Sequence, residues 1–111
     1  MKSIVTEYTN ISAFSQNRRE CDHHLIFGSG LRELADEDGL TIPLTHKEHN
    51  LGKDTEKIHE NQAAEKLSKM AGQLAYEKEY YRKALETLGE IEKGSDPARE
   101  MFRERYGISY L

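Results

Sequence analysis

The sequence predicts an α+β fold, mostly helical overall, in which a short two-stranded hairpin precedes long C-terminal helices. Two patterns support this prediction. The short apolar run Leu25-Ile26-Phe27 ends at Gly28, and a second run follows over residues 40–44, so that each run has the length of a strand. From residue 58 to residue 91, apolar residues recur every three or four positions, which is typical of one face of an amphipathic helix.

The two predicted strands bracket a loop that contains a helical turn or two. Apolar residues at 31, 34 and 35, with Gly39 as a C-terminal cap, predict this helical segment over residues 31–38. Pro43 has no backbone N–H to donate, so the second strand is expected at an edge or near its own end. The arrangement predicts a hairpin with a wide connection.

We expect a single domain of three segments: an N-terminal arm (1–20), a motif segment (21–61) and a helical tail (62–111) that packs on the motif. In the arm, Ile4 and Val5 could form a short strand. The chain has the length of one domain with one modest core.

The helical tail is expected to contain one long helix and a last, shorter one. Asp54 or Thr55 is the expected N-cap of the long helix, Gly72 marks an expected bend, and Lys93-Gly94 an expected end. Asp96-Pro97 then has the N-cap and first-position pattern of a new helix. The apolar tail residues are expected to dock back onto the domain: Phe102, Tyr106, Ile108, Tyr110 and Leu111.

Composition excludes several classes of protein. The apolar fraction of 36% and the charged fraction of 32% indicate a hydrophilic globular chain. One cysteine excludes an internal disulfide framework and a four-cysteine zinc site, and fits a reducing cytoplasm. No apolar run has membrane-spanning length, and the N-terminus lacks a signal-peptide core, so we expect an intracellular protein that does not enter a membrane. The net charge of −4 argues against passive electrostatic binding of nucleic acid, although a nuclease can offset it with a cation.

All five histidines lie between positions 23 and 59, and the stretch Cys21-Asp22-His23-His24 opens this region. Neighbouring side chains of a strand point to opposite faces, so His23 and His24 are expected to have different roles. His59 shares the predicted helical face with Ala63 and would point toward the strands. These patterns favour a metal site, because neutral imidazole is the commonest protein metal ligand.

Simpler interpretations apply to several of these residues. His46 has polar neighbours and is expected to be an ordinary surface histidine, and a buried, hydrogen-bonded role is the default for His59 alone. Cys21 is expected to be a small buried side chain or an additional ligand. By itself Arg32, like Arg18 and Arg19, is indistinguishable from a solvated surface charge.

Taken in order, these motifs resemble the HNH, or His-Me finger, nuclease superfamily, and within it small HNH-like proteins of bacteriophages and prophages. The resemblance rests on CDHHLIFGSGLRELADEDGLTIPL, followed by EHN and IHEN, and on a tail that ends in glycine, tyrosine and leucine. It implies a ββα-metal motif over 21–61. The middle asparagine of the family is missing here; the region before the second strand is Asp36-Glu37-Asp38-Gly39, so an aspartate or the backbone would do its work.

The resemblance also implies roles for individual residues. His23, His49 and His59 match metal ligands, and His24 matches the general base. Because His49 and His59 are ten residues apart, a loop such as 50–53 must bulge out for both to reach one ion. Three imidazoles suit zinc or another transition metal better than magnesium. The phosphate backbone of DNA would contact the basic residues Arg32, Lys47 and Lys53.

The implied function is a metal-dependent endonuclease that hydrolyses DNA phosphodiester bonds in the cytoplasm of a bacterial host, as a phage or prophage DNA-processing, packaging or recombination accessory. His24 would take a proton from the attacking water. The alternative is a catalytically inactive, zinc-stabilised module that binds nucleic acid or protein, with the 63–91 helical face pairing with a partner or with a second copy of the chain. A metal-free helical adaptor is a third interpretation.

Overall fold

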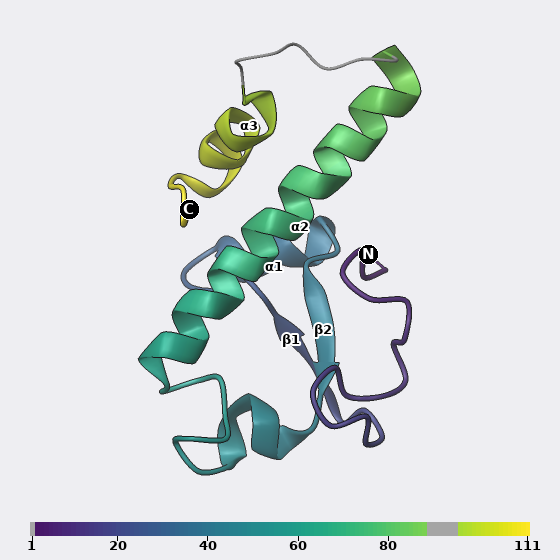
Figure 1. The fold of residues 1–111 in the computed structure, drawn as a ribbon. Helices are drawn as coiled ribbons and strands as arrows, with labels where there is room; N and C mark the ends of the chain where they lie inside the picture. The colour runs from purple at the N-terminus through teal and green to yellow at the C-terminus, as the bar shows by residue number, and fades with distance from the viewer. Residues whose placement is uncertain (1, 89–95) are drawn as a thin grey trace.

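The computed structural model describes residues 2–88 and 96–111, which form a two-stranded hairpin and a set of helices (Figure 1). The predicted α+β class, mostly helical, is confirmed. The elements in chain order are β1 (Cys21–His24), α1 (Leu31–Glu37), β2 (Thr41–Leu44), the π-helical turn η1 (Lys47–Leu51), α2 (Gln62–Leu88) and α3 (Pro97–Tyr106). Helix α2 crosses the molecule beside the hairpin, and α3 packs against α2 (Figure 1).

Strand β1 lies earlier in the chain than the apolar run that predicted it. It pairs antiparallel with β2, from Cys21 opposite Leu44 to His24 opposite Thr41. The segment predicted as the first strand, residues 25–27, follows β1, and its first two side chains, Leu25 and Ile26, are buried in the core. The assignment of residues 25–27 to the strand was wrong, because this apolar run marks the centre of the core. The expectation that His23 and His24 lie on a strand is confirmed.

The N-terminal arm covers the outer edge of β2. The Ile4 N–H donates to the Gly39 carbonyl at 2.9 Å, and the Ala13 N–H donates to the Pro43 carbonyl at 2.8 Å. The strand expected at Ile4 and Val5 is wrong, since the described residues 2–20 contain nothing more regular than one isolated β-bridge. A covered edge cannot pair with the strand of another molecule.

Helix α1 forms where residues 31–38 predicted it, with Gly39 after it at φ 72°. Helix α3 holds the C-terminal end of α1 in place. The Arg105 guanidinium and the Tyr106 hydroxyl both donate to the Asp38 carboxylate, at 2.6 Å each. The predicted cap of α3 is confirmed, because the Asp96 carboxylate accepts from the Arg99 N–H and Pro97 is the first helical residue.

Helix α2 begins six or seven residues later than predicted. Residues 54–56 form only a turn, and the Asn61 side chain accepts from the Ala64 N–H as the helix begins. His59 therefore lies in the turn before α2, and not on the helix. Gly72 does not interrupt α2, which runs unbroken from Gln62 to Leu88. The expected helix end at 93–94 lies outside the described residues.

The buried face of α2 is rotated by about one residue from the predicted face. Ser68 and Gln73 are buried, whereas the predicted Leu67 and Leu74 are 63% and 55% exposed. The reason is close packing at Gly72, where an added Cβ would lie 2.8 Å from Cγ1 of Ile26. Small and hydrogen-bonding residues fit so close a contact, and leucines do not. Of the predicted stripe, Ile91 lies outside the described residues.

The contact at Gly72 yields a stability prediction. We expect Gly72→Val to lower the free energy of unfolding by about 2 kcal/mol, because the new side chain must displace buried Ile26, although valine favours a helix more than glycine does. Urea unfolding followed by circular dichroism measures this change. Thr87→Ala, at an exposed position of α2, is the control and should be neutral or slightly stabilising. A neutral Gly72→Val would show that the helix and the hairpin are not tightly packed.

Candidate metal centre

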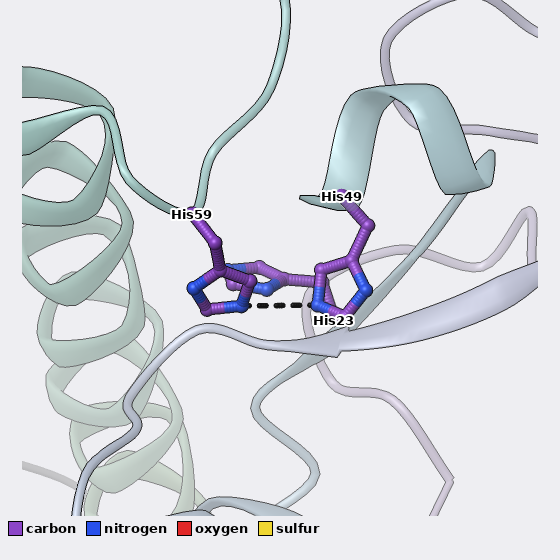
Figure 2. A group of neighbouring side chains, drawn as sticks. All are labelled: His23, His49 and His59. Atoms are coloured by element: carbon purple, nitrogen blue, oxygen red, sulfur yellow. Dashed lines mark hydrogen bonds between the residues drawn. The ribbon is translucent and has the colours of Figure 1, made fainter. Parts of the chain in front are cut away.

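Three histidines from three parts of the chain meet beside the first turns of α2. His23 comes from β1, His49 from η1 and His59 from the turn before α2 (Figure 2). One nitrogen from each ring can be chosen so that all three lie within 4.8 Å of one another. The His49 and His59 Nε2 atoms are 3.1 Å apart. A group of this kind could hold a metal ion.

Backbone hydrogen bonds bring His49 and His59 together. The His59 N–H donates to the His49 carbonyl at 3.1 Å, and the preceding Ile58 N–H donates to the Glu48 carbonyl at 2.9 Å. The chain between these bonds, residues 50–57, forms the bulging loop that the spacing of the two histidines required. The Glu48 carboxylate anchors η1, because it accepts from the Ser12 hydroxyl at 2.5 Å and from the Thr45 N–H at 2.9 Å.

The pleat of β1 separates its two histidines. The His23 side chain is fully buried, and it points toward α2 and the other two ligand candidates. The His24 side chain, which is 21% exposed, hydrogen-bonds with Asp36 of α1. The alternation expected for neighbouring strand residues therefore holds, and His24 is not part of the three-histidine group.

Ser68 of α2 determines which His23 nitrogen carries the proton. Its hydroxyl donates to the Leu25 carbonyl at 2.8 Å, so toward the His23 Nε2, 2.7 Å away, it can only accept. Neutral His23 therefore carries its proton on Nε2, which leaves a lone pair on Nδ1. That Nδ1 is buried and has no hydrogen-bond partner. A buried nitrogen with a free lone pair, beside two other imidazoles, has the chemistry of a metal ligand.

Burial keeps His23 neutral. Desolvation, followed by the charges that His49 and His59 would carry, lowers the pKa of His23 to about 3. The pKa of His49 is also lowered, by burial first and then by His59. Neutral imidazole is the form that binds metal ions, so little competition from protons is expected at neutral pH.

Glu65 acts on His59 as Ser68 acts on His23. The Glu65 carboxylate lies 3.3 Å from the His59 Nδ1 and can only accept, so the proton of His59 is on Nδ1 and its Nε2 has the lone pair. Glu65 and Ser68 are three positions apart on α2 and share a face of the helix. The helix thus contributes no ligand of its own; it orients two of the three histidines.

The three histidines could hold a metal ion, and their spacing can be compared with that of a tetrahedral zinc site. Zinc–nitrogen bonds of about 2.0–2.1 Å place tetrahedral ligand nitrogens about 3.4 Å apart. The observed 3.1 Å and the outer limit of 4.8 Å bracket this separation, so small rotations of the rings would complete the geometry. Three neutral nitrogens suit zinc, nickel or a similar ion, whereas magnesium requires oxygen ligands.

A surface cleft of about 450 Å³ opens beside the histidine group. His49 and His59 line it together with His24 and Arg32. The residues that complete the lining are Asp22, Phe27, Asn50 and Glu60. The cleft therefore brings the predicted base and one predicted phosphate contact next to two of the predicted ligands.

The other predicted site residues lie elsewhere. Lys47 lines a separate hollow with Arg18 and His46, and neither Lys47 nor Lys53 lines the cleft. The Cys21 thiol is directed at the carbonyls of Leu44 and Thr45, outside the three-histidine group. Burial, followed by the nearby carboxylates, raises the pKa of Cys21, which suits a structural thiol better than a ligand.

Sequence reasoning missed Ser68, Glu65 and Phe27. Serine and glutamate are common on helices, and no sequence signal marked these two, because the face of α2 that carries them is set by tertiary packing. Phe27 was assigned to a strand, but its ring packs edge-on against His59, with centroids 4.7 Å apart. The Lys69 ammonium lies 4.7 Å from the centre of the same ring.

Comparison of this chain with protein-family models, curated proteins and solved structures finds no match. None of the helices in the described part of the chain is long and apolar enough to span a membrane. The geometry of the histidines and their cleft is therefore the basis on which a function is inferred.

Because Ser68 and Glu65 hydrogen-bond to ligand candidates, we expect substitutions of these two residues to change the metal affinity. We expect Ser68→Ala and Glu65→Ala each to weaken zinc binding about 10- to 100-fold, because each removes the partner that sets a ligand tautomer. Competition titration against a chromophoric chelator measures the affinity. Glu56→Ala, which makes the same substitution in an exposed turn, should bind zinc like the wild type. Unchanged affinity in both variants would contradict the assigned tautomers.

Burial of His23 predicts how the metal-free protein responds to pH. Below pH 6.5 the unfolded chain takes up a proton at this residue, whereas the folded chain does so only near pH 3. The free energy of unfolding should therefore fall from pH 6.5 downward, by a slope approaching about 1.4 kcal/mol per pH unit, and His49 adds to it in the same direction. Urea unfolding between pH 8 and 5.5 tests this. The range from pH 7 to 8 is the internal control, and equal stability throughout would contradict the burial of a neutral His23.

Proposed function

We propose that this protein is a metal-dependent, HNH-like endonuclease that hydrolyses DNA phosphodiester bonds. One observation carries the proposal. Adjacent residues of one strand face opposite ways, so that His23 completes a three-imidazole group while His24 lines the cleft beside that group. A ligand set and a separate proton acceptor beside one cleft are the two components that metal-assisted phosphodiester hydrolysis needs.

The proposed chemistry uses few groups. A divalent ion, when bound, supplies a Lewis acid that stabilises negative charge on the phosphate and the leaving oxygen. His24 accepts a proton from water as the water oxygen attacks phosphorus; a new P–O bond forms and the bond between phosphorus and the leaving deoxyribose oxygen breaks. The leaving oxygen departs with the bonding electron pair and takes a proton from solvent water. Arg32, in the same cleft, contacts a phosphate oxygen of the DNA backbone and holds the strand in place.

The resemblance to HNH proteins supports the assignment of His23, His49 and His59 as ligands. Besides the missing asparagine, this chain departs from the family pattern in that the last ligand candidate lies in a turn, and the following helix supplies Ser68 and Glu65. A role in phage or prophage DNA processing is proposed from the resemblance alone. Lys47 and Lys53 remain proposed contacts to DNA outside the cleft.

A second candidate is a catalytically inactive, zinc-stabilised module that binds a partner or a second copy of the chain. The exposed residues Leu67, Leu74 and Leu85, of which the last is 51% exposed, favour it. Their spacings of seven and eleven residues place them on one side of α2. The net charge of −4 also favours a protein partner over nucleic acid.

A plasmid-nicking assay distinguishes the two candidates. We expect the wild type with zinc, nickel or manganese to nick supercoiled DNA, and His24→Ala to lose about 10²- to 10⁴-fold of that activity while it keeps its bound metal. His46→Ala, which changes an exposed histidine outside the cleft, is the control and should nick normally. Equal nicking by His24→Ala would eliminate His24 as the base. A wild type that binds zinc without nicking DNA would favour the inactive module.

A further inference from the structure

The hydrogen bond between His24 and Asp36 has no part in the chemistry described so far. The His24 Nε2 lies 3.2 Å from the Asp36 Oδ1. A carboxylate can only accept, so neutral His24 carries its proton on Nε2 and has its lone pair on Nδ1. Asp36 therefore selects the nitrogen that can accept a proton from water.

Helix α1 places Asp36 and Arg32 together. The two residues are four positions apart, so they share one face of the helix. Arg32 lines the cleft, and Asp36 holds the histidine that lines the same cleft. One short helix thus presents both a phosphate contact and a partner for the proposed base.

Helix α1 is itself held firmly at two places. Ala35 is fully buried, and its carbonyl accepts from the Leu40 N–H at 2.8 Å. At the C-terminal end, Asp38 receives the two hydrogen bonds from α3 described above. A side chain on so constrained a helix has a well-defined position, which an orienting group requires.

A purely structural role explains this pair poorly. The Asp36 side chain is 59% exposed, and exposed ion pairs contribute little to stability. The pair lies outside the three-histidine group, so its loss should not disturb metal binding. The direct contact between the two side chains instead favours a role in the orientation of His24.

We propose that Asp36 is the positioning residue for His24, and that its hydrogen bond holds the imidazole in the rotamer and tautomer that present Nδ1 to the water. This inference rests on the proposed nuclease function for its consequence in catalysis. The structural part of the inference, that Asp36 holds the His24 ring, does not depend on the nuclease function.

The test combines kinetics with a measurement that needs neither metal nor DNA. We expect Asp36→Ala to lower kcat for DNA nicking about 10- to 100-fold with little change in KM, metal content or melting temperature. Asp36→Asn retains an oxygen that can accept from Nε2–H, and should recover part of the loss. Glu33→Ala removes the same charge from an exposed position of α1 and should behave as wild type.

Three-bond NMR couplings at His24, measured in the metal-free protein, report its side-chain rotamer. The wild type should show a single rotamer, and Asp36→Ala an average of several. An unchanged rotamer in Asp36→Ala, or equal losses in the alanine and asparagine variants, overturns the inference. If the wild type does not nick DNA, the proposed function fails, but the couplings still decide whether Asp36 holds His24.

Discussion

The close contact between α2 and the hairpin is the constraint on which the candidate site depends. Because Gly72 has no side chain, the helix can approach Ile26 closely, and Ser68, one turn earlier, then reaches both His23 and the Leu25 carbonyl. Glu65 reaches His59 from the same helix. A helix held even one methyl group farther away would leave both imidazoles without the partners that set their tautomers.

The part of the site built on β1 could be predicted from the sequence, because strand geometry is local. Alternation alone separated His23 from His24, and the ten-residue spacing of the other two histidines required the loop that the structure contains. The hairpin, the α1 segment and the cap of α3 were predictable for the same reason. Each depends on neighbouring residues and on simple stereochemistry, which a single sequence carries.

The arrangement of α2 could not be predicted so well. Periodicity identified a helix but chose the wrong face, because Leu67 and Leu74 are more apolar than the serine and glutamine that are in fact buried. Burial there is decided by how close another element comes, which is a property of the tertiary structure. The same applies to Glu65, Ser68 and Asp36, whose contributions depend on distances between segments that lie far apart in the sequence.

The paired backbone at residues 48–49 and 58–59 has an evolutionary consequence. Because this short ladder closes the loop at its base, the number of residues inside the loop can change at a small entropic cost while His49 and His59 keep their positions. Asn50, the first residue of that loop, lines the cleft, as does Glu60, which follows the closing pair. Insertions and deletions in this loop can therefore change the shape of the cleft, and with it the choice of substrate, while the ligand positions of His49 and His59 are kept.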